Sequence, residues 1–174
     1  MQDILIVVDM QNDFIDGALG TPEAVDIVPR VAAKIISFPG RVIFTRDTHD
    51  DNYFDTQEGR RLPVRHCVRE TRGWQICSKL EALRCEKAVD KPTFGSAGLA
   101  EMLLRADGEE KIATITLVGL CTDICVISNA MIIKAFLPEA TVRVDAACCA
   151  GVTPESHRTA LKAMKNCQID IINE

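Results

Sequence analysis

Two kinds of segment alternate along this sequence, and the alternation limits the folds open to it. Short runs of β-branched and other apolar residues predict strands near 3–8, 41–46, 85–89, 112–118, 141–145 and 168–172. Between them lie segments expected to form helices, near 25–37, 75–83, 97–106, 123–136 and 155–166. A strand that is followed by a helix pairs in parallel with the next strand, because the helix carries the chain back across the sheet. The alternation therefore predicts an α/β fold.

Two helix starts agree with this prediction. Thr21-Pro22-Glu23 and Thr153-Pro154-Glu155 each offer a capping hydroxyl, a proline suited to the first helical position and an early acid. The 174 residues are 47% hydrophobic, which is enough for one substantial core. We expect a single domain over residues 1–174, with three α/β/α layers around a six-stranded, mostly parallel, Rossmann-like sheet.

Composition and charge narrow the functional classes. The net charge is −5, and the basic residues are dispersed apart from Arg60, Arg61, Arg65, Arg69 and Arg72 in one long loop, so a nucleic-acid partner is not expected. No apolar stretch is long enough to cross a membrane, and the first residues show no export signal. We therefore expect a cytoplasmic protein with no membrane contact. The eight cysteines lie within strand and helix patterns, and reduced thiols are expected.

Three chemically active side chains lie close to the ends of predicted strands. Asp9 follows the run Ile4–Val8, Lys91 follows the run 87–90, and Cys125 lies where an apolar run breaks at Gly119 and restarts as a helix. Ligands of open α/β sheets bind beyond the carboxyl ends of strands, so an acid, a base and a thiol can converge there. Taken singly, each residue has an alternative: a loop cap, a solvated charge and a small buried hydrophobe.

Cys125 is the candidate nucleophile. The first turn of a helix presents unpaired N–H groups and the positive end of the helix dipole, so we expect a lowered pKa and a reactive thiolate. A redox pair of Cys121 and Cys125 is the competing chemistry. The spacing weakens it, because Cys121 belongs to the strand-to-helix turn rather than to a Cys-x-x-Cys helix start.

Three blocks of sequence, in this order, resemble the signature blocks of the isochorismatase-like cysteine hydrolase superfamily. They are Asp9-Met10-Gln11-Asn12-Asp13-Phe14, Lys91-Pro92-Thr93-Phe94-Gly95-Ser96 and Gly119-Leu120-Cys121-Thr122-Asp123-Ile124-Cys125-Val126. The resemblance implies that Asp9 accepts the proton of Cys125 and that Lys91 holds the pair together. It also implies an oxyanion hole formed by the backbone N–H groups of Cys121 and Cys125, aimed by a cis Leu120–Cys121 bond.

The long stretch 47–74 shows little periodicity and resembles the metal-binding loop of the nicotinamidase branch. Asp47 and His49 match an Asp-x-His pair, His66 matches a later histidine, and Glu58 lies where some relatives supply a further ligand. One divalent ion, Zn²⁺, Fe²⁺ or Mn²⁺, suits such carboxylate and imidazole donors. The alternative is a polar loop with two ordinary histidines.

The resemblance implies hydrolysis of a small amide through a thioester, with nicotinamide as the model substrate and Phe14 and Leu120 at the substrate. It also implies a homo-oligomer, a dimer or a tetramer. Two alternatives stay open: a carbamoyl or ureido amidase or an isochorismatase without metal, and a thiol redox or metal-binding protein. Glu70 departs from the pattern because relatives usually have glycine there, and Trp74 is expected to pack in the core.

Overall fold

Six parallel strands form one sheet in the computed structural model, which describes residues 1–174. The strands are β1 (Gln2–Val8), β2 (Arg41–Asp47), β3 (Val89–Lys91), β4 (Ile112–Leu120), β5 (Thr141–Ala150) and β6 (Asp170–Ile172), in the spatial order β3-β2-β1-β4-β5-β6. Every neighbouring pair is parallel. The order reverses between β1 and β4, the place where open α/β sheets bind ligands. The predicted α/β class and parallel sheet are confirmed.

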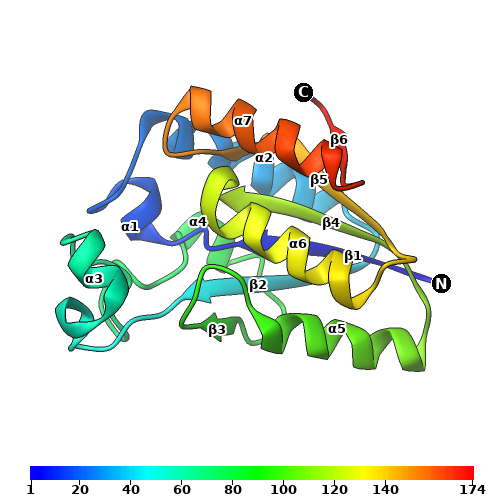
Figure 1. Ribbon diagram of the computed structural model, residues 1–174, viewed down its shortest axis with the longest axis horizontal. Helices are drawn as coiled ribbons and strands as arrows, with labels where there is room; N and C mark the ends of the chain where they lie inside the picture. The colour runs from blue at the N-terminus through cyan, green and yellow to red at the C-terminus, as the bar shows by residue number, and fades with distance from the viewer.

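Helices cover both faces of the sheet, as Figure 1 shows. They are α1 (Asn12–Ile15), α2 (Pro22–Ser37), α3 (Gln57–Arg61), α4 (Ser78–Glu81), α5 (Ala97–Glu109), α6 (Ile127–Phe136) and α7 (Pro154–Asn166), with two further turns, η1 (Tyr53–Asp55) and η2 (Thr122–Val126). The hydroxyls of Thr21 and Thr153 accept hydrogen bonds from Ala24 N and Ser156 N, so both predicted caps are confirmed. None of the helices combines the length and apolar character needed to cross a bilayer.

The central strand β1 explains why its sequence is apolar without interruption. Ile4, Ile6 and Val8 pack into one buried cluster with α5, α6 and α7, while Leu5 and Val7 pack into a second cluster with α2 and α4. All five side chains are fully buried. A strand covered on both faces has no solvent-facing side, so it carries no alternating polar residues.

Three predicted elements are wrong in their limits, and the first is the strand expected at 141–145, which continues to Ala150 as β5. The strand expected at 85–89 is the short edge strand Val89–Lys91, which pairs only with β2. The helix expected at 75–83 shrinks to Ser78–Glu81, because an antiparallel bridge between Gln11 and Ile76 draws the preceding residues into extended backbone. The last two errors come from tertiary pairing that overrides local propensity.

Gly119 is the glycine whose replacement we expect to cost most. Its φ is +115°, and a Cβ placed there would lie 2.1 Å from Val8 O on the neighbouring strand. We expect Gly119→Ala to lower the free energy of unfolding by roughly 2–5 kcal/mol, through backbone strain and a steric clash. Gly108, inside α5 with nothing within 4 Å of its would-be Cβ, is the control. Gly108→Ala should raise stability by about 0.5–1 kcal/mol in urea titrations; similar midpoints for the two variants would contradict the argument.

Candidate active site

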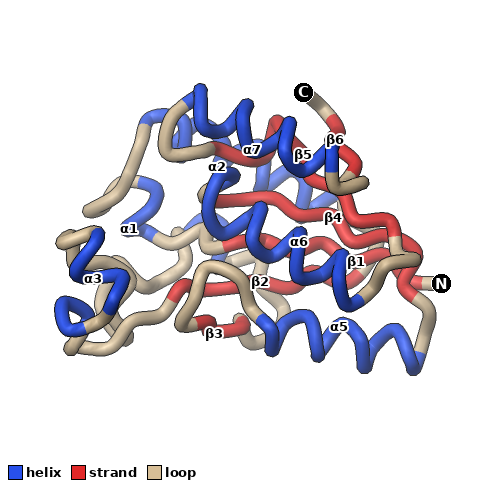
Figure 2. Tube along the Cα trace, viewed as in Figure 1, coloured by secondary structure: helices blue, strands red, loops and turns tan.

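The carboxyl ends of the strands and the loops that follow them gather at one edge of the sheet, the side of α1 and α3 in Figure 2. Asp9 follows β1, Lys91 is the last residue of β3, and Cys125 lies in η2 after β4. Lys91 Nζ lies 2.6 Å from Asp9 Oδ2 and 3.5 Å from Cys125 Sγ. The structure thus brings into contact the three groups that the sequence places near the ends of separate strands.

Asp9 is held by a residue that the sequence did not single out. Thr45 Oγ1 on β2 donates a 2.6 Å hydrogen bond to Asp9 Oδ1. The remaining carboxylate oxygen of Asp9 faces Lys91. Only the pairing of β1 with β2 reveals Thr45, because nothing in its local sequence distinguishes it from other strand residues.

The three groups share a site closed to solvent. Asp9 and Lys91 have no exposed surface, and Cys125 is 4% exposed. Burial raises the pKa of Asp9, although Lys91 opposes the shift. Burial alone would lower the pKa of Lys91, but the Asp9 carboxylate and the Cys125 sulfur raise it above its usual value. Lys91 is therefore a permanent cation at this site.

The expected lowering of the thiol pKa is wrong. Burial raises the pKa of Cys125 well above its usual value, and the neighbouring Asp9 carboxylate adds to the rise. Lys91 favours the thiolate, but its charge is already balanced by Asp9 at 2.6 Å. The resting group is consequently a thiol beside a carboxylate and an ammonium, and its activation requires transfer of the proton to Asp9.

The turn that carries Cys125 is a π-helical turn, Thr122–Val126, which leads into α6. Cys121 O accepts hydrogen bonds from Ile124 N and Val126 N, and the Leu120–Cys121 peptide bond is cis, as the resemblance implied. Burial raises the pKa of the Cys121 thiol to about 12. A redox role, which needs accessible thiolates, gains no support from either cysteine.

Four further side chains meet beside this site and fit one metal ion. Asp47 ends β2, His49 and His66 come from the long loop, and Glu58 comes from α3; one donor atom from each lies within 4.8 Å of the others. His49 Nε2 lies 2.9 Å from Asp47 Oδ2, yet it is buried and makes no hydrogen bond. His66 Nδ1 lies 2.8 Å from Val64 O, which orients Nε2 toward the carboxylates. An orphaned imidazole nitrogen facing two carboxylates is what a divalent cation would satisfy.

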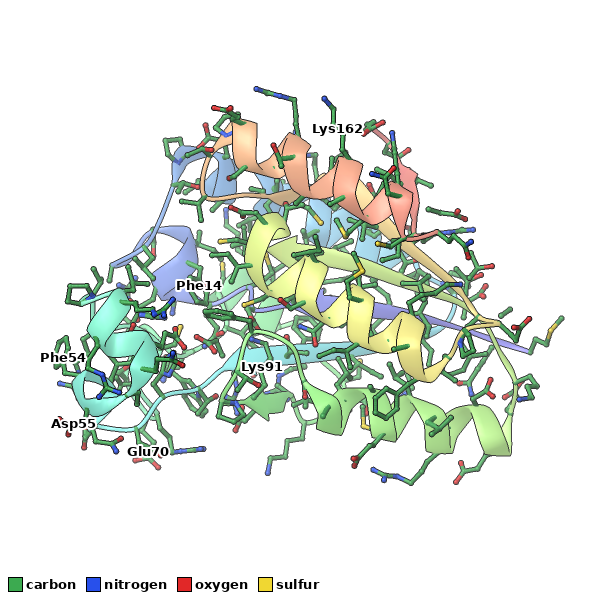
Figure 3. All side chains as sticks on the ribbon, in the orientation of Figure 1. Phe14, Phe54, Asp55, Glu70, Lys91 and Lys162 are labelled. Atoms are coloured by element: carbon green, nitrogen blue, oxygen red, sulfur yellow. The ribbon has the colours of Figure 1, made fainter.

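Aromatic rings hold the two imidazoles in place. The Tyr53 ring packs edge-on against His49 and His66, at centroid distances of 4.8 and 5.1 Å. The Phe14 ring lies 5.6 Å from the His66 ring, centroid to centroid. Figure 3 labels Phe14 and Lys91 toward the end of the molecule where α1 and α3 lie. Tyr53 was not singled out in the sequence, although it lies within the loop that carries the ligands. Leu120, expected at the substrate, is 1% exposed and packs into the α2 cluster.

A cavity of about 500 Å³ opens beside the donor cluster. Its lining includes His49, Glu58, Arg61, Leu62, Thr93 and Phe94, so it lies between α3 and the segment that follows Lys91. The volume suits a small molecule.

The structure accounts for the departure at Glu70 and tests the expected position of Trp74. Glu70 has φ of +66°, a conformation that glycine adopts without strain, which accounts for the glycine usual there. The prediction that Trp74 packs in the core is wrong: it is half-buried, its indole N–H donates to Thr48 Oγ1, and the Arg46 guanidinium lies over its ring at 3.6 Å.

The fold and the site define a class: a parallel α/β protein with a cysteine, an aspartate and a lysine at the switch point of its sheet. The chain belongs to the isochorismatase domain family, whose model matches residues 3–173. It is similar to the pyrazinamidase of Pyrococcus horikoshii solved in complex with zinc, with 31% identity, full coverage of both chains and a TM-score of 0.81.

Two further solved structures show the same likeness. The nicotinamidase/pyrazinamidase of Bacillus subtilis is 29% identical, with a TM-score of 0.82 over 99% of this chain and 100% of that one. The N-carbamoylsarcosine amidase of Thermoplasma acidophilum is 27% identical, with a TM-score of 0.75 over 98% of this chain and 95% of that one.

Proposed function

We propose that this protein is a cysteine-dependent hydrolase that cleaves the C–N bond of a small amide, in the manner of a nicotinamidase, and releases the acid and ammonia. The observation that carries the proposal is the contact of Lys91 Nζ with both Asp9 Oδ2 and Cys125 Sγ inside a buried site. Family membership and the likeness to pyrazinamidase and nicotinamidase structures support the choice of an amide substrate.

The first half of the reaction forms a thioester. Asp9 takes the proton from Cys125 as the sulfur bonds to the amide carbon, and Lys91 stabilises the carboxylate and the developing thiolate. The backbone N–H groups of Cys121 and Cys125 receive the carbonyl oxygen as it gains charge. The C–N bond then breaks, Asp9 returns the proton to the nitrogen, and ammonia leaves.

The second half restores the enzyme. Asp9 takes a proton from water as the water oxygen bonds to the thioester carbon. The C–S bond breaks, the sulfur recovers its proton from Asp9, and the acid leaves. Each turnover therefore consumes one amide and one water and yields one acid and one ammonia.

Asp47, His49, Glu58 and His66 would hold one divalent metal ion, and zinc is supported by the zinc-bound Pyrococcus structure. When bound, such an ion supplies a Lewis acid that binds a substrate heteroatom and orders water. The residues around it do the positioning: Tyr53 orients the imidazoles, and Phe14, which packs against His66, is the residue that we expect beside the substrate ring.

A substrate panel with ammonia detection tests the proposal. Nicotinamide and pyrazinamide represent the first function, and N-carbamoyl amino acids represent the alternative favoured by the likeness to the Thermoplasma amidase. Release of ammonia from nicotinamide or pyrazinamide is the expected result. Turnover restricted to carbamoyl compounds would move the protein to the alternative, and no turnover of any amide would contradict the hydrolase assignment.

The acid limb of the pH profile should report Asp9. The reaction needs the Asp9 carboxylate as the base, and burial raises its pKa, so kcat/KM should fall as pH drops through a midpoint above the ordinary aspartate value of about 3.9. Lys91 should not titrate at neutral pH, because its pKa is raised. A profile of kcat/KM against pH, measured with the metal ion in excess so that its loss does not set the limb, would check this, and a limb at or below pH 3.9 would contradict it.

Metal removal should impair turnover without destroying the thiol site. We expect protein purified without chelator to contain one divalent ion, and His49→Ala with His66→Ala to lose it. His157, the remaining histidine, lies outside the cluster, so His157→Ala should retain the ion. Elemental analysis and chelator titration give the measurement. The affinity for the ion should also fall as the pH is lowered, because a protonated imidazole cannot bind metal. Full metal content in the double variant would refute the ligand set.

The location and assembly of the protein are part of the same proposal. All eight cysteines are free thiols, which suits the reducing cytoplasm. We expect a homo-oligomer, a dimer or a tetramer, on the strength of the superfamily resemblance, and light scattering of the purified protein would measure it.

A further inference from the structure

The side chain of Gln11 is buried and engaged with the backbone of a metal-ligand residue. Its Nε2 donates to Asp47 O at 2.8 Å, and its Oε1 accepts from Asp47 N at 2.7 Å. The same Nε2 donates to Trp74 O at 2.9 Å. Gln11 has no exposed surface, so these bonds form away from water, where an unpaired polar group is costly.

The reason for this arrangement lies in the sheet. The pairing of β1 with β2 ends at Val7 and Phe44, while β2 continues to Asp47. On its other side Asp47 lies against Lys91 of β3. Without Gln11, the N–H and C=O groups of Asp47 that face β1 would have no partner. The amide of Gln11 pairs with both, as the backbone of a longer β1 would.

Trp74 holds the residues on either side of Asp47. Its indole N–H donates to Thr48 Oγ1 at 2.8 Å, and the Arg46 guanidinium lies over its ring at 3.6 Å. Its own carbonyl is held by Gln11. Gln11 and Trp74 together therefore contact the consecutive residues 46–48, and we call this pair the Asp47 clamp.

We propose that the Asp47 clamp positions Asp47 as a metal ligand and that Gln11, two residues after Asp9, ties the metal site to the acid that activates the thiol. The inference rests on the proposed metal site. Asp47 Oδ2 must point at His49 and His66, from which it lies 2.9 and 3.6 Å. With the backbone of Asp47 unclamped, its carboxylate samples other directions, and the ligand set is no longer preorganised.

The test compares Gln11→Met with wild type and with Asn12→Ala. Methionine keeps the length of glutamine and removes all three hydrogen bonds. Asn12 is the matched control: its Nδ2 donates a 2.8 Å hydrogen bond to Arg72 O in the loop that carries Trp74, but it does not contact Asp47. Zinc affinity is measured by competition with a chromophoric chelator, and ligand geometry by the visible absorption of the cobalt-substituted protein. We expect Gln11→Met to bind zinc about 10–100-fold more weakly with an altered cobalt spectrum, and Asn12→Ala to match wild type in both.

A second variant separates the amide donor from the acceptor. Gln11→Glu keeps an acceptor for Asp47 N but turns a carboxylate toward Asp47 O and Trp74 O, so it should not restore zinc affinity. Unchanged zinc affinity and cobalt spectrum in Gln11→Met would overturn the clamp while leaving the metal site intact. A wild-type protein that binds no zinc or cobalt would overturn the metal site, and the clamp with it.

Trp74→Phe takes over the test if Gln11→Met does not fold, since it loses only the N–H to Thr48 and keeps a ring under Arg46. Zinc binding several-fold weaker than wild type is the expected result, and unchanged binding would overturn the proposal.

Discussion

Cys125→Ala should fold normally and release ammonia at a rate lower by about 10⁴-fold or more, because the variant has no atom that can form the thioester. The cost in stability should be small, since only one buried sulfur is removed. Ammonia assays at saturating substrate and a urea titration give the two measurements.

Cys148→Ala is the matched control for this variant. Cys148 is also a buried thiol with a raised pKa, about 11, but it packs in the α2 cluster away from Asp9 and Lys91. Its replacement should leave turnover close to wild type. Substantial turnover by Cys125→Ala would remove Cys125 as the nucleophile. An equal loss of turnover in both variants would indicate a general effect of replacing a buried cysteine.

The pair Asp9 and Lys91 should show the second largest effect. Asp9→Asn and Lys91→Met should each lower kcat/KM by roughly 10³-fold or more, and the double variant should lose little beyond the worse single, because the groups act as one unit. Stability should behave differently. Each single variant leaves a buried charge without its nearest partner, with only Asp47 Oδ1 at 3.6 Å remaining beside Lys91, and should lose about 3–5 kcal/mol. The double variant removes both charges and should recover part of that loss.

An exposed ion pair of similar length provides the control. Arg41 Nη2 lies 2.7 Å from Glu86 Oε2, but both side chains are more than a third exposed. Arg41→Met should cost at most about 1 kcal/mol and leave turnover unchanged. Additive losses of kcat/KM in the Asp9 and Lys91 variants would show that the two groups act separately, and a near-normal rate in either single variant would remove that residue from the site.

Several features of the site could be predicted from the sequence because they depend on local pattern. The apolar run Ile4–Val8 predicted a strand, and the alternation of strands and helices predicted parallel strands whose carboxyl ends share one edge of the sheet. Asp9, Lys91 and Cys125 could therefore be expected at that edge. Asp47, His49 and His66 were also expected as metal ligands, through the resemblance of their segment to the metal-binding loop of the nicotinamidase branch.

Other features depend on contacts between distant segments, which no local pattern contains. Thr45 reaches Asp9, and Gln11 reaches Asp47, only because β1 and β2 pair in one register. Trp74 lies outside the core, where its indole N–H donates a hydrogen bond to Thr48 Oγ1.

The pKa of Cys125 shows most clearly the difference between what the sequence indicates and what the folded structure decides. Its place at the start of a helix, which the sequence shows, favours the thiolate. Its burial beside a carboxylate, which only the folded chain creates, favours the thiol, and the second effect prevails. The sequence by itself determined which reactive side chain follows which strand: the acid Asp9, the base Lys91 and the thiol Cys125. The tertiary structure decided their protonation, their partners and the shape of the metal donor set, because desolvation and hydrogen bonding depend on what the folded chain packs around each group.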